Sequence, residues 1–107
     1  MQRYGQLIAV KEDQIEAYEC LHAAVWPDVL AMIHACNMRN YSIFRHQHHL
    51  FAYFEYVGDD YAADMARMAA DPTTQAWWTH TDPMQEPLET REAGEWWATM
   101  REVFHID

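Results

Sequence analysis

The sequence predicts a single α+β domain in which a four-stranded antiparallel sheet carries its helices on one face. The 107 residues are the length of one domain. Short segments of alternating apolar residues indicate strands, and segments with apolar residues three or four positions apart indicate helices. Their order is strand, helix, strand, strand, helix, strand, which is the split βαβ pattern.

The first half of the pattern is a strand followed by a broken helix. Residues 2–10 alternate in polarity and have two usable faces. Asp13 is expected to cap a helix over residues 14–36. Pro27 lacks an amide donor, so we expect a break just before it and a second helical segment that begins there.

The second half begins with a predicted hairpin formed by residues 40–45 and 50–57, both rich in aromatic and β-branched side chains. A helix is expected over residues 61–70, and Asp71 with Pro72 should begin a further short helix. Prolines and a glycine indicate a loop over residues 81–94. The alternating residues 99–106 are expected to form the closing strand.

The sheet face away from the helices is predicted to be apolar too. Leu7 and Ala9 lie opposite Tyr4 and Ile8, and the hairpin is apolar on both sides. A face of this kind needs a cover, and a second copy of the sheet is the simplest one. We therefore expect a two-fold symmetric homodimer.

Charge and composition narrow the function. Seven Lys and Arg against 17 Asp and Glu give a formal charge of −10, which disfavours nucleic acid and anionic lipid and tolerates a neutral ligand. No apolar run is long enough to span a membrane, and no signal peptide is visible. Cys20 and Cys36 lie too far apart on a continuous helix to pair, so free thiols in the cytoplasm are expected.

Tyr18 and His22 are the strongest indication of function. Both fall on the apolar stripe of the first predicted helix, one turn apart. Core packing alone can explain either residue, but a titratable imidazole beside a neutral phenol is also what acid–base chemistry requires.

Trp77 and Trp78 form a second candidate group, because an indole face packs well on the apolar face of a sugar. Tyr41 is expected on the same strand face as Ile43, pointing towards the helix that carries His22. Trp96 and Trp97 are interpreted as packing. The His46, His48 and His49 stretch lacks the other ligands of a metal site, so neither a metal nor a cofactor is expected.

Four segments together resemble the L-rhamnose mutarotase family over essentially the whole chain. They are listed here in chain order: Tyr18-x-x-x-His22-x-x-x-Trp26-Pro27-Asp28, Asn40-Tyr41-Ser42-Ile43, Trp77-Trp78 and Arg101-Glu102-Val103-Phe104-His105. The resemblance implies a dimeric α+β barrel of ferredoxin-like subunits that interconverts the α and β anomers of a free 6-deoxyhexose without a cofactor. It implies that His22 is the proton donor and that Tyr18, Tyr41, Trp77 and Trp78 contact the sugar.

Other functions remain open from the sequence. Family members are also associated with L-fucose, and the residues around 79–94, with His80 and Asp82, have no secure counterpart in the family. Two further hypotheses are a barrel of the same architecture that binds haem or an aromatic ligand through His22 or His105, and a non-catalytic small-ligand module.

Overall fold

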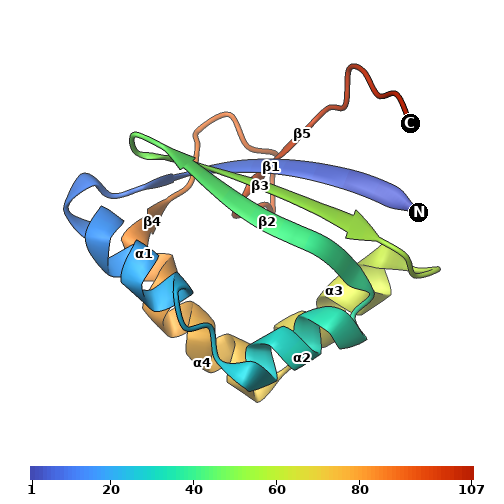
Figure 1. Cartoon of the computed structure of the whole chain (residues 1–107), viewed down its shortest axis with the longest axis horizontal. Coiled ribbons are helices and arrows are strands. Elements are labelled where there is room, and N and C mark those ends of the chain that lie inside the picture. The colour runs from blue at the N-terminus through green and yellow to red at the C-terminus, as the bar shows by residue number, and fades with distance from the viewer.

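The computed structural model describes all residues, Met1–Asp107. It confirms the α+β class, because four helices cover one face of a curved antiparallel sheet (Figure 1). In the sheet, β3 lies between β2 and β1, and two short strands, β4 and β5, share the other edge of β1. The elements are β1 (Gln2–Val10), α1 (Ile15–His22), α2 (Pro27–Ala35), β2 (Met38–His46), β3 (His49–Tyr56), α3 (Tyr61–Ala69), α4 (Pro72–Thr81), β4 (Gln85–Glu86) and β5 (Ala98–Met100).

The expected break before Pro27 is confirmed, because α1 ends at His22 and α2 begins at Pro27. Proline fits the first turn of α2, where its missing amide hydrogen would have no helical partner. The expected cap at Asp13 is wrong. A 3-10 turn, Glu12–Gln14, precedes α1, so Gln14 takes the cap position and no side chain caps the helix.

Both helices of the second half begin with aspartate caps. The Asp60 carboxylate accepts a hydrogen bond from the Ala63 amide at 3.1 Å at the start of α3. The Asp71 carboxylate accepts one from the Thr74 amide at 2.9 Å at the start of α4, as the sequence predicts.

A bulge in β2 sets which side chains face the helices. Two residues, Asn40 and Tyr41, lie between the paired positions Arg39 and Ser42, where the opposite strand has only one. Asn40 adopts a positive φ of 51°, a conformation that asparagine tolerates better than most residues. The extra residue keeps Tyr41 facing the helices.

The core lies between the sheet and the helices in two clusters. The first contains Ile8, Val10, Tyr18 and Leu50, and the second contains Cys36, Met38, Phe54 and Met68. Cys20 and Cys36 are both free thiols, as expected. No helix is both long and apolar enough to cross a membrane.

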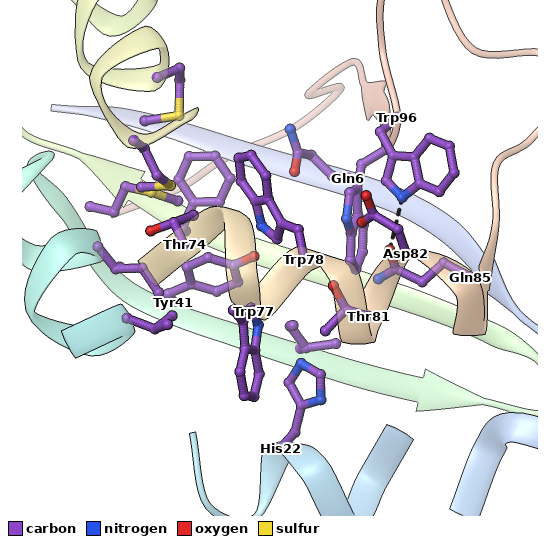
Figure 2. Close-up of a pocket in the computed structure, with 18 of the residues that line it drawn as sticks. Gln6, His22, Tyr41, Thr74, Trp77, Trp78, Thr81, Asp82, Gln85 and Trp96 are labelled. Carbon is purple, nitrogen blue, oxygen red and sulfur yellow. Dashed lines mark hydrogen bonds between the residues drawn. The ribbon is translucent and has the colours of Figure 1, made fainter. Parts of the chain in front are cut away.

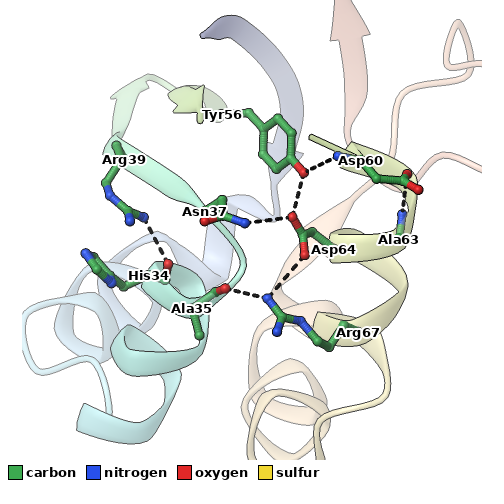
Figure 3. A network of polar contacts seen from close by, with 9 residues as sticks. All are labelled: His34, Ala35, Asn37, Arg39, Tyr56, Asp60, Ala63, Asp64 and Arg67. Carbon is green, nitrogen blue, oxygen red and sulfur yellow. Dashed lines mark hydrogen bonds and ion pairs between the residues drawn. The ribbon is translucent and has the colours of Figure 1, made fainter. Parts of the chain in front are cut away.

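Asp64 on α3 anchors a polar network that joins three elements (Figure 3). Its carboxylate accepts hydrogen bonds from Tyr56 Oη at 2.5 Å and from Asn37 Nδ2 at 2.9 Å. Arg67 bonds both the Asp64 carboxylate and the Ala35 carbonyl at the end of α2. These hydrogen bonds stabilise the charged carboxylate and so lower the pKa of Asp64, and the bond from Tyr56 has the largest effect. They also join α3 to β3 and to the α2–β2 turn.

The end of the chain differs from expectation. The sequence predicts a closing strand over residues 99–106, but β5 covers only Ala98–Met100. Residues 101–107 form no strand and are exposed, and they leave the body on the side of the sheet away from the helices (Figure 1). The segment predicted as a loop, 81–94, contains a 3-10 turn and the short strand β4, which pairs with Ala9 and Val10.

The outer face of the sheet carries large exposed apolar side chains. Phe44 keeps 60% of its surface exposed and Phe51 keeps 39%, and their ring centroids lie 6.2 Å apart. On the tail beyond β5, Val103, Phe104 and Ile106 are at least 77% exposed.

Candidate active site

A pocket of about 400 Å³ lies between the inner face of the sheet and the helices, and 14 of its 20 lining residues are hydrophobic. This is a volume typical of small-molecule sites. All five residues that the sequence singled out line it (Tyr18, His22, Tyr41, Trp77 and Trp78). Figure 2 shows four of them reaching into the pocket from α1, β2 and α4.

Tyr18 and His22 stack one turn apart on α1, with ring centroids 4.0 Å apart and planes 24° from parallel. Tyr18 is 3% exposed, whereas His22 is half-buried. Burial raises the pKa of the Tyr18 phenol to about 12, and a hydrogen bond from Gln85 partly opposes this. Tyr18 therefore stays a neutral hydroxyl at physiological pH.

A backbone contact selects the tautomer of His22. Nδ1 lies 2.9 Å from the carbonyl oxygen of Tyr18. Because a carbonyl can only accept, Nδ1 must carry the hydrogen, and the free lone pair of the neutral ring is on Nε2. Burial lowers the pKa of His22, which favours this neutral form. His22 thus offers a proton acceptor to the pocket.

The two adjacent indoles on α4 have different partners. Trp77 is 6% exposed and lies edge-on to His22, with ring centroids 5.3 Å apart, and to Trp26 at 5.1 Å. Trp78 packs against the second core cluster under the sheet. Consecutive helical residues point about 100° apart, so the pair forms two walls of the pocket.

Tyr41 reaches the pocket from the opposite side, on the inward-facing position that the bulge creates. Its ring lies 5.4 Å from that of Phe54. Desolvation raises the pKa of its phenol, although 36% of the residue's surface is exposed. Tyr41 shares the inward face with Ile43, as the sequence predicts, and both line the pocket.

The sequence did not identify a group of polar and aromatic residues that completes the pocket. This group is Gln6, Asp82, Gln85, Trp96 and Trp97. Four of the five lie in or just after the segment expected to be a loop. Trp97 packs against the first core cluster, as the sequence predicts, whereas Trp96 is 41% exposed. The indole Nε1 of Trp96 donates to Gln85 Oε1 at 2.8 Å, which joins the two ends of this segment (Figure 2).

Two other polar candidates lie apart from the pocket. His80 is exposed and packs edge-on against Trp26, at 5.5 Å between centroids. His46 and His49 pair across the hairpin end, and the His48 and His49 rings lie 4.4 Å apart. No three His, Cys, Asp or Glu side chains are grouped so that they could hold a metal ion.

Comparison with known proteins identifies the family of this chain. The chain matches the model of the L-rhamnose mutarotase family over residues 3–106. It is 30% identical over 115 residues to a protein named L-rhamnose mutarotase from Oceanobacillus iheyensis and 32% identical over 109 residues to one from Lactiplantibacillus plantarum, each match covering 100% of both chains. It is also 34% identical to a protein named L-fucose mutarotase from Xanthomonas campestris, over 99% of this chain and 89% of the other.

Solved structures confirm the fold. The structure of L-rhamnose mutarotase FA22100 from Formosa agariphila matches with a TM-score of 0.78 and 20% identity, over 100% of both chains. Tetracenomycin F2 cyclase from Streptomyces glaucescens shares the fold with a TM-score of 0.70 and 14% identity, again over 100% of both chains. The length and strength of the family match decide the assignment: this chain is a member of the L-rhamnose mutarotase family.

Proposed function

We propose that this protein interconverts the α and β anomers of free L-rhamnose by opening and reclosing the sugar ring. The observation that carries the proposal is the His22 imidazole, which is neutral, fixed in one tautomer by the Tyr18 carbonyl and placed on the wall of an apolar pocket. Family membership and the names of the relatives support the same reaction.

His22 is proposed as the proton carrier. Nε2 takes the proton of the anomeric hydroxyl, the bond between the anomeric carbon and the ring oxygen breaks, and its electron pair goes to the ring oxygen. Both oxygens are attached to one carbon, so the same nitrogen can return the proton to the ring oxygen. The open aldehyde then rotates and recloses by the reverse path, and no proton is gained or lost overall.

The remaining predicted site residues are proposed to hold the sugar. Trp77, Trp78 and Tyr41 form walls suited to the apolar face and methyl group of a 6-deoxy sugar. The neutral hydroxyl of Tyr18, beside His22, can hydrogen-bond a sugar oxygen without competing for the proton. The net charge of −10 is compatible with an uncharged substrate.

L-Fucose is a second candidate substrate, favoured by the relative that carries the name L-fucose mutarotase. The two sugars are distinguished by saturation-transfer NMR on a panel of free L- and D-6-deoxyhexoses. We expect the wild-type protein to accelerate anomer exchange of L-rhamnose more than that of any other sugar. Faster exchange of L-fucose would move the assignment to that sugar, and no acceleration of either would remove the proposed activity.

The working form is proposed to be a homodimer in which two outer sheet faces cover one another, as in a dimeric α+β barrel. The exposed Phe44 and Phe51 support this, because Phe51 alternates with the buried, helix-facing residues of β3, Phe44 is its partner on β2, and both so lie on the face that the helices leave open. The apolar tail over 101–107 leaves the body on the same side (Figure 1). We also propose a cytoplasmic location, supported by the two unpaired thiols.

A further inference from the structure

Gln85 is a buried polar residue in the pocket wall, and its amide contacts two groups of the pocket. It is 5% exposed and begins β4, where its backbone pairs with Val10. Buried amides need partners at both ends, and the two partners here are Trp96 and Tyr18. The Trp96 indole can only donate a hydrogen bond, whereas the Tyr18 hydroxyl can donate or accept one. This difference fixes the direction of both hydrogen bonds of the Gln85 amide.

Trp96 determines which way the Gln85 amide faces. An indole N–H can only donate, so the group 2.8 Å from Nε1 of Trp96 must be the amide oxygen, Oε1. The NH₂ end of Gln85 then faces Tyr18, with Nε2 3.4 Å from the phenolic oxygen.

The orientation of Gln85 in turn directs the hydroxyl of Tyr18. The phenolic oxygen accepts from Gln85, so the Tyr18 hydrogen points elsewhere, and the side chain lines the pocket. Meanwhile the Tyr18 carbonyl accepts from His22 Nδ1. The result is an acceptor on His22 and a donor on Tyr18 side by side, with ring centroids 4.0 Å apart.

We propose that Gln85 and Trp96 are positioning residues that hold the Tyr18 hydroxyl as a hydrogen-bond donor to the ring oxygen of the bound sugar. This inference rests on the proposed function and adds to it the role of the segment around residues 85–96. The hydrogen bond from Tyr18 stabilises the negative charge that develops on the ring oxygen as the ring opens. Nε2 of His22 meanwhile transfers the proton from the anomeric hydroxyl to the ring oxygen.

The test replaces the hydrogen-bond donor that Gln85 presents to Tyr18 with an acceptor. In Gln85→Glu, the carboxylate accepts from both Trp96 and Tyr18, so the Tyr18 hydrogen turns away from the sugar. We expect kcat for L-rhamnose exchange to fall about tenfold or more, with a smaller change in KM. Tyr18→Phe should lose a similar factor. Gln47→Glu, the same substitution on the exposed hairpin turn, is the matched control and should keep wild-type kcat.

A double-mutant cycle separates positioning from a structural role. If Gln85 acts through the Tyr18 hydroxyl, adding Gln85→Glu to Tyr18→Phe costs no further activity. Independent losses that multiply, or a Gln85→Glu protein as active as the Gln47→Glu control, would overturn the inference. Circular dichroism checks the fold of each variant.

A second variant covers the case in which a buried glutamate prevents folding. Trp96→Phe removes the indole donor, lets the Gln85 amide turn over, and should lower kcat several-fold only when Tyr18 is present. An equal loss in the Tyr18→Phe background would contradict the inference. If the wild-type protein does not exchange the anomers, the proposed function is wrong, and the inference is tested separately by measuring the L-rhamnose affinity of the same variants by calorimetry. In that experiment, losses of binding free energy that add in the double variant, or a Gln85→Glu protein with wild-type affinity, would overturn the inference.

Discussion

Replacing Phe44 by glutamate should convert the proposed dimer into monomers. Phe44 is 60% exposed on the outer sheet face and lies 6.2 Å from Phe51 between ring centroids. A full phenylalanine side chain has about 200 Å² of surface, so about 120 Å² of Phe44 is still exposed and can be buried when the dimer forms. At about 25 cal/mol per Å², this burial contributes about 3 kcal/mol to the free energy of dimerisation. Two such rings in a two-fold dimer contribute about 6 kcal/mol, roughly a 10⁴-fold change in dimer Kd.

Light scattering coupled to gel filtration at micromolar concentration measures this directly. The wild-type protein should have the mass of two chains and Phe44→Glu that of one. Leu30→Glu is the matched control, because Leu30 is 53% exposed but lies on α2, away from the outer sheet face. A wild-type monomer, or a Phe44→Glu dimer of unchanged Kd, would refute the reasoning about the covered sheet.

Two further predictions concern the bulge and the imidazole. Both Asn40→Gly and Asn40→Val lose the bond to Glu55, but only valine is strained at φ 51°, so Asn40→Val should be less stable than Asn40→Gly by about 1 kcal/mol in urea unfolding. Equal stabilities would contradict the role given to this backbone conformation. Because burial lowers the pKa of His22, kcat/KM should be constant near pH 7 and fall only below the ordinary imidazole value of 6.5. The neutral ring also stabilises the fold above pH 6.5, and that contribution is lost as the pH falls through the lowered pKa. A loss of activity that already begins above pH 7 would argue against neutral His22 as the acceptor.

The sequence predicted the parts of the fold that local chemistry determines. Pro27 ends one helical segment and begins another because of its own ring, and the aspartates at 60 and 71 stand where helices begin. Tyr18 and His22 share a helix face through spacing alone, so their stacking was predictable.

The parts that the sequence did not predict depend on distant partners. Alternation over 99–106 is typical of a strand, but only Ala98–Met100 pair with β1, opposite Gly5–Leu7, while β4 pairs at Ala9–Val10. Beyond Met100, Glu102 meets Arg3 of β1 in an ion pair between side chains. Gln85 and Trp96 are eleven positions apart, most of the chain between them is irregular, and no periodicity predicts their contact. From the sequence, Trp96 is therefore interpreted only as a packing residue near the last strand.

Anomer exchange of L-rhamnose with and without the His22 imidazole tests the central claim most directly. Saturation-transfer NMR should show rapid exchange between the α and β signals with the wild-type protein and only the uncatalysed rate with His22→Ala, while circular dichroism shows the same fold for both. A His22→Ala protein that exchanges the anomers as fast as the wild type would contradict the account.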